Sequence, residues 1–197
     1  MHSNGLYSLV FLLLLPADYA WAELRQFEMT IEEVELEVAP GFKTNVWGFN
    51  GQVPGPLYHV NEGDEVEVTV YNMTTLNHTV HWHGIYQTNS WRSDGVPHVT
   101  QHPIEPGESY TYRFVADRVG SLWYHCHVNV SEHVGLRGMW GPFVVTPNEP
   151  TELERSVTKE AILMFSGWNS EVAEIYGEGG HPGQVIDYFS INGKSFP

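Results

Sequence analysis

Apolar and polar residues alternate along much of the chain. Within residues 33–38, Val and Leu fall on one face of an extended segment and Glu falls on the other. The same period of two recurs at residues 66–70 and 110–114. Turn-forming Gly and Pro separate these segments, and no segment has the pattern of a convincing amphipathic helix. The pattern predicts an all-β sandwich or barrel.

A linker and a repeated motif suggest how the chain is divided. Residues 147–150 begin and end with Pro, and a strand-like apolar segment follows at residues 161–165. The tail at residues 188–197 echoes residues 49–54, because each carries an Asn-Gly pair in a similar context. We interpret this echo as an internal repeat at the scale of a domain. The sequence therefore predicts one complete domain and the start of a second, incomplete one, at residues 23–150 and 151–197.

The N-terminus has the features of an export signal. Residues 9–15 form an apolar run that is too short to span a bilayer. Ala20-Trp21-Ala22 follows with the small-x-small pattern of a signal-peptidase site. We predict a signal peptide at residues 1–22 and a protein that is periplasmic or secreted. No other run is long enough for a membrane helix, so we expect no membrane partner.

The charge balance excludes one large class of partners. The chain carries a formal net charge of −15 at pH 7. Nucleic-acid binding requires a basic surface that can neutralise phosphates. We therefore expect no nucleic-acid partner, and the acidic balance is most simply explained by solubility.

The single cysteine stands between two histidines, in His125-Cys126-His127. On a strand the two imidazoles point to one face and the sulfur to the other. A lone cysteine cannot form an internal disulfide, but its thiolate is a good ligand for a soft metal. His133 and Met139 follow at intervals of six residues. Cys, His and a later Met are ligands of blue-copper sites.

A second histidine cluster repeats this parity. His81 and His83 share one face of a strand, and His78 has the opposite parity. If this strand lies beside the cysteine strand, two groups form on opposite faces: His81, His83, His125 and His127 on one, and His78, Cys126, His133 and Met139 in the interior.

Copper fits these groups better than two other readings of the same residues. Structural zinc sites use paired cysteines, and this chain has one cysteine. A nucleophilic Cys–His pair also remains open, but thiolate attack needs an accessible sulfur, and a buried strand position argues against that.

These motifs resemble those of the multicopper oxidases, specifically the small two-domain laccase-like type. The resemblance runs from about Phe27 to Pro197. It rests on His81-Trp82-His83-Gly84, Asp94-Gly95-Val96-Pro97 and Trp123-Tyr124-His125-Cys126-His127. It implies a cupredoxin-like (plastocyanin-like) Greek-key β-sandwich that binds copper. It also implies one-electron oxidation of a small reducing substrate, such as a phenol or a metal ion, coupled to reduction of dioxygen.

By position, the resemblance assigns ligands to each copper. A type 1 copper would take His78, Cys126, His133 and Met139. His81 would bind a type 2 copper, and a type 3 pair would take His83, His125 and His127. Asp94 matches an acid near the cluster that we expect to assist proton delivery, although an Asp before Gly can equally cap a turn. The spacing from Cys126 to Met139 is slightly longer than is usual in the family, so another axial group could replace the thioether.

The chain supplies only half of a trinuclear cluster. In the family the cluster needs eight histidines from two domains, and four are identified here. The resemblance implies that the others come from a second domain, which in the small enzymes belongs to a neighbouring subunit of a homotrimer.

Two other functions compete with the oxidase. A copper nitrite reductase also pairs cupredoxin domains in a trimer, but it does not need the second histidine of the His125-Cys126-His127 motif. A non-catalytic blue-copper electron carrier would leave His81 and His83 without a role. We therefore favour the oxidase.

Overall fold

The computed structural model describes residues 22–170 and 186–195, and in these residues the chain is built mainly of strands. Two four-stranded sheets make up most of it, with strand orders β2-β1-β4-β6 and β3-β8-β7-β5. The strands of the first sheet are β1 (Leu24–Ala39), β2 (Phe42–Phe49), β4 (Glu65–Asn72) and β6 (Ser109–Val115). Those of the second sheet are β3 (Tyr58–Asn61), β5 (Val80–His83), β7 (Gly120–Cys126) and β8 (Trp140–Thr146).

The helical elements are short. They are the 3₁₀ turn η1 (Trp91–Ser93) and the helices α1 (Val130–His133) and α2 (Glu152–Ser156). None of the helices within residues 22–170 and 186–195 is long and apolar enough to cross a bilayer. The predicted signal peptide, apart from Ala22, lies outside the described residues.

Alternation builds the core, as the sequence pattern predicts. Val66, Val68 and Val70 of β4 are buried, whereas Glu65 is exposed. Their side chains meet those of the opposite sheet, including the fully buried Trp82. Burial of these apolar groups between two sheets is the main stabilising contribution. The predicted all-β sandwich is confirmed.

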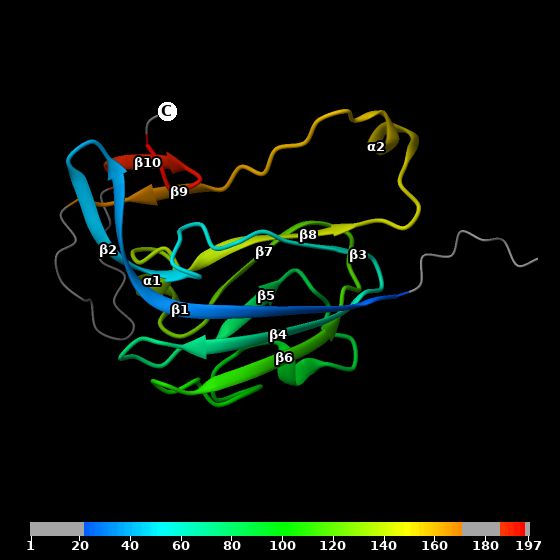
Figure 1. Cartoon of the computed structure of the whole chain (residues 1–197), viewed down its shortest axis with the longest axis horizontal. Helices are drawn as coiled ribbons and strands as arrows, with labels where there is room; N and C mark the ends of the chain where they lie inside the picture. Colours follow the sequence, from blue (N-terminus) through cyan, green and yellow to red (C-terminus); the bar gives the residue numbers. More distant parts are fainter. Residues whose placement is uncertain (1–21, 171–185, 196–197) are drawn as a thin grey trace, which may run out of the picture.

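Strand β1 pairs with two neighbouring strands. Its first half runs parallel to β4, and its second half runs antiparallel to β2 (Figure 1). The sixteen-residue strand therefore extends beyond the sandwich, and β2 follows it.

A small two-stranded sheet near the C-terminal end packs against this extension. It consists of β9 (Phe165–Trp168) and β10 (Tyr188–Ile191), which pair antiparallel beside β2 (Figure 1). Trp168 is buried in a second apolar cluster with Val38 and Trp140. The strand predicted at residues 161–165 is wrong in its position, because regular pairing begins only at Phe165. Alternating apolar residues mark an extended segment but do not supply it with a partner strand.

The repeated Asn-Gly turn adopts the same structure in both places. Asn50 and Asn192 both have a positive φ and are followed by a Gly with a positive φ. The Asn50 side chain accepts from the backbone N–H of Thr30 at 2.7 Å, and that of Asn192 accepts from Met164 N–H at 2.9 Å. In each turn the Asn side-chain amide also donates to a backbone carbonyl two residues before that partner. The two turns share the same hydrogen bonds as well as the same residue types, which supports the interpretation of an internal repeat.

Candidate metal centres

Strands β5 and β7 bring the two histidine motifs together. They pair antiparallel, with His81 opposite His125 and Val80 opposite Cys126. Because side chains alternate along each strand, the two imidazoles share one face and the sulfur points to the other. Strand pairing thus places two groups of donor atoms on opposite faces of one pair of strands.

The interior group consists of His78, Cys126 and His133. The Cys126 Sγ lies 3.7 Å from His78 Nδ1 and 3.2 Å from His133 Nδ1, and the two nitrogens are 3.2 Å apart. All three residues are buried. A point equidistant from the three atoms lies about 2.0 Å from each, which is close to the length of a metal–imidazole bond.

Met139 closes the loop that carries His133. Its backbone N–H donates to His133 O at 3.0 Å, and its carbonyl accepts from Cys126 N–H at 3.1 Å. The Met139 side chain is fully buried in the same apolar cluster as Cys126. These contacts hold Met139 beside the group, and its role as an axial ligand stays a prediction.

The far nitrogen of His78 is fixed by a threonine. His78 Nε2 lies 2.9 Å from Thr74 Oγ1, which in turn donates to Asn72 Oδ1 at 2.8 Å. With its hydroxyl proton given to Asn72, Thr74 accepts the Nε2–H of His78, and Nδ1 is left to bind a metal. Sequence reasoning missed Thr74, because a hydroxyl four residues before a histidine has many uses in a β protein.

Burial keeps the interior imidazoles neutral. Burial, reinforced by the neighbouring His133, lowers the pKa of His78 to about 3. Burial also lowers the pKa of His133 to about 4 and raises that of the Cys126 thiol to about 12. Neutral imidazoles are ready to bind a metal at neutral pH, whereas the thiol needs a bound cation to deprotonate.

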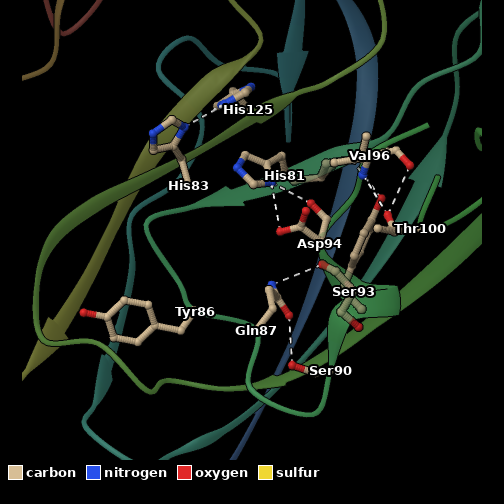
Figure 2. Close-up of polar contacts among 12 residues, drawn as sticks. His81, His83, Tyr86, Gln87, Ser90, Ser93, Asp94, Val96, Thr100 and His125 are labelled. Carbon is tan, nitrogen blue, oxygen red and sulfur yellow. Dashed lines mark hydrogen bonds and ion pairs between the residues drawn. The ribbon is translucent and has the colours of Figure 1, made fainter. Parts of the chain in front are cut away.

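The second group lies on the other face of the same strands. The potential ligand atoms of His81, His83 and His125 all lie within 4.8 Å of one another. His83 is exposed, and its Nδ1 lies 3.3 Å from His125 Nε2 (Figure 2). The ring centre of His127 lies 5.4 Å from that of His81, the same distance as that of His83, and 5.9 Å from that of His125, but its ligand atoms are outside the group of three within 4.8 Å. The structure thus brings all four predicted histidines to one face, with the ligand atoms of three of them closest together.

Backbone carbonyls orient two of these rings. His125 Nδ1 lies 2.7 Å from the carbonyl oxygen of Cys126, and His81 Nδ1 lies 2.6 Å from that of Asp94. Each carbonyl must accept an Nδ1–H, so Nε2 of each ring is left as the ligand atom.

Asp94 contacts His81 twice, as Figure 2 shows. Besides the backbone bond, its Oδ1 lies 3.4 Å from His81 Nδ1. The close approach depends on Gly95, whose φ is +81° and where a Cβ would lie 1.9 Å from Val80 O. Any side chain there would push the loop off β5. Asp94 is therefore well placed beside the histidine group, while its role in proton delivery stays a prediction.

A family model for multicopper oxidases matches residues 30–150. The chain belongs to the multicopper oxidase family. It is 36% identical over 170 residues to multicopper oxidase MCE of Talaromyces pinophilus, a match that covers 78% of this chain and 28% of that protein. It is also 36% identical over 151 residues to Laccase-1 of Cryptococcus neoformans var. grubii, which covers 74% of this chain and 24% of that one.

Solved multicopper oxidases share the fold. The structure of multicopper oxidase mgLAC is 65% identical with a TM-score of 0.84, and covers 89% of this chain and 55% of that one. The blue copper oxidase of Nitrosomonas europaea is 55% identical, with the same TM-score and coverage. These likenesses confirm the predicted cupredoxin-like fold. The chain thus spans about a quarter of the two curated relatives and just over half of the two solved structures.

The donor atoms fit the copper that multicopper oxidases carry. One thiolate and two imidazoles around a point form the trigonal ligand set of a blue-copper site, and a group of imidazoles alone suits copper as well. The match to oxidases and laccases also favours the oxidase hypothesis over the reductase and the electron carrier.

Proposed function

We propose that this chain forms the first cupredoxin domain and the beginning of the second domain of a laccase-like multicopper oxidase. The domains are residues 23–150 and 151–197. The observation that carries the proposal is the back-to-back arrangement of the two donor groups. One tripeptide, His125-Cys126-His127, contributes to both of them.

The ligand assignments follow the two groups. The interior group of His78, Cys126 and His133, with Met139 as the axial ligand, would hold a type 1 copper. On the other face, His81 would hold a type 2 copper, and the type 3 pair would take His83, His125 and His127. The short distances within each group of three donors support this division.

Copper would supply one-electron redox chemistry at the interior group and dioxygen reduction at the histidine group. The protein's part is to hold the ligands and connect the sites. Burial excludes water from Cys126, and the covalent link to His125 gives a direct path between the sites. The substrate would be a small reducing molecule, such as a phenol or a metal ion. Asp94, beside His81, would deliver protons to the histidine group.

The histidine group needs further ligands. We propose that they come from a second domain of a neighbouring subunit in a homotrimer. The exposure of His83 supports this, because a ligand for a shared cluster must face the surface where the partner lies. We further propose that residues 1–22 are a signal peptide and that the protein works in the periplasm or outside the cell.

Copper counting combined with spectroscopy tests the proposal. A protein that contains this chain and a whole second domain, purified and loaded with copper, should show the intense visible absorption of sulfur-to-copper charge transfer and should consume oxygen with a phenolic substrate. Cys126→Ser should abolish the absorption, whereas His83→Ala should keep it and lose oxygen uptake. His59→Ala, at an exposed histidine outside both groups, should change neither.

The copper content separates the alternatives. Four coppers per functional unit support the oxidase. Two coppers with nitrite reduction would indicate the reductase, and one copper without oxygen uptake would indicate a carrier. Either of the last two results would overturn the proposal.

A further inference from the structure

The indole of Trp47 lies against both imidazoles of the interior group. Its ring meets that of His133 at 4.7 Å and 70°, and that of His78 at 5.6 Å and 61°, both edge-on. Trp47 belongs to β2, in the sheet opposite β7, and is only 8% exposed. One side chain from the facing sheet thus contacts two of the three proposed ligands.

Arg137 holds the indole from another side. Its guanidinium carbon lies 5.6 Å from the centre of the Trp47 ring. The backbone N–H of Trp47 donates to the backbone carbonyl of Arg137 at 2.9 Å, and Arg137 Nη1 donates to the backbone carbonyl of Asn45 at 3.0 Å. These bonds tie β2 to the loop between β7 and β8 that carries His133.

The arginine brings a charge close to the interior group. Its side chain is 13% exposed, and its Nε lies 3.8 Å from Oε1 of Glu132, whose side chain is 4% exposed. Neither of these two atoms has a hydrogen-bond partner within residues 22–170 and 186–195. The other carboxylate oxygen of Glu132 accepts from Asn129 Nδ2 at 2.8 Å. Even so, a buried ion pair is commonly no more stabilising than apolar residues of the same volume. Packing alone therefore does not explain the pair.

We propose that Trp47 and Arg137 form a clamp that positions His78 and His133 and sets the redox potential of the copper they hold. The inference rests on the proposed function. Trp47 is a positioning residue, because it touches the ligand rings and acts through them. The positive charge of Arg137 favours the reduced, less positive metal, and Glu132 offsets part of this effect.

Two variants of Trp47 test the positioning role. Trp47→Leu removes the aromatic contact, and Trp47→Phe keeps an aromatic ring against the imidazoles. We expect Trp47→Leu to lower the affinity of the interior group for Cu(II) about tenfold and to alter the charge-transfer band and the copper hyperfine splitting. We expect Trp47→Phe to keep most of the wild-type Cu(II) affinity and a spectrum close to that of the wild type.

Two variants of Arg137 test the electrostatic role. Arg137→Met removes the charge, and Arg137→Lys keeps it. At a fixed ambient potential, Arg137→Met should shift the Cu(I)-to-Cu(II) ratio about tenfold toward Cu(II), and Arg137→Lys should shift it much less.

A core variant supplies the matched control. Phe143→Leu removes a similarly buried ring that contacts Trp82 and Phe114, and none of its ring contacts within the described residues is to a histidine. It should lower stability but leave the charge-transfer band and the copper potential unchanged. If Trp47→Leu and Arg137→Met also leave the charge-transfer band and the copper potential unchanged, the clamp is overturned and the proposed function stands. A wild-type protein without the charge-transfer band would overturn both.

Discussion

Acidification should destabilise the metal-free protein through His78. Burial, followed by the charge of the neighbouring His133, lowers the pKa of His78 to about 3 in the folded state. In the unfolded chain an ordinary histidine has a pKa of about 6.5. Between these two values the unfolded state binds a proton that the folded state does not. The stabilising effect of neutral His78 is thus complete above pH 6.5 and is lost progressively as the pH falls toward 3.

The magnitude follows from the two pKa values. At pH 4.5 the linkage relation gives a loss of about 3 kcal/mol for His78 alone, relative to pH 7.5. His133 and His125, whose pKa values burial lowers to about 4, change in the same direction. A loss of this size is a large fraction of the stability of an ordinary domain, which is about 5–15 kcal/mol.

Urea unfolding of the metal-free protein at pH 7.5 and 4.5 measures the effect. His78→Gln cannot titrate, so its free energy of unfolding should fall by about 2–3 kcal/mol less than that of the wild type over this range. His59→Gln, at an exposed histidine, should show the wild-type pH dependence. Equal pH dependence in the wild type and His78→Gln would refute the reasoning, because it would mean that His78 is protonated as readily in the folded protein as in the unfolded chain.

Three further predictions concern the supports of the two groups. Thr74→Val should lower the Cu(II) affinity of the interior group by about tenfold, measured by competition with a chelator, because it frees the far nitrogen of His78. Gly95→Ala should lower stability by about 1–3 kcal/mol more than Gly107→Ala in thermal unfolding, since both have a φ near +80° but only Gly95 lies against Val80 O. Equal losses would show that the close approach has no cost. Copper at a hundred times its dissociation constant should stabilise the protein by about 2.7 kcal/mol, and a chelator should reverse this.

The fold could be predicted from local pattern because strands such as β4 and β6 bury one face. Alternation in β4 and β6 marks both the strand and its buried side, and the Asn-Gly pairs mark turns that accept a positive φ. Partner choice could not be predicted in the same way. The segment at residues 161–165 has a strand-like pattern, yet regular pairing starts only at Phe165, since a partner strand must lie within hydrogen-bonding distance.

The residues that contact the proposed ligands could not be predicted from the sequence either. Nothing in the spacing of the chain links Trp47 to His133 or Thr74 to His78, because these contacts arise from sheet packing and loop closure. Sequence reasoning found ligand types from their chemistry and parity. It missed Trp47, Thr74 and Arg137, which are common residue types whose position alone gives them a role.

By itself, the sequence determined that sulfur and paired imidazoles must leave opposite faces of a strand, because side-chain direction alternates with every residue. Only the tertiary structure decided that the donor atoms of His78, Cys126 and His133 lie 3.2–3.7 Å apart. It also decided that Trp47 packs against the ring of His133 and that Arg137 packs against Trp47. The physical reason is that parity is a local property of the backbone. Convergence depends instead on how two sheets and a loop pack against one another.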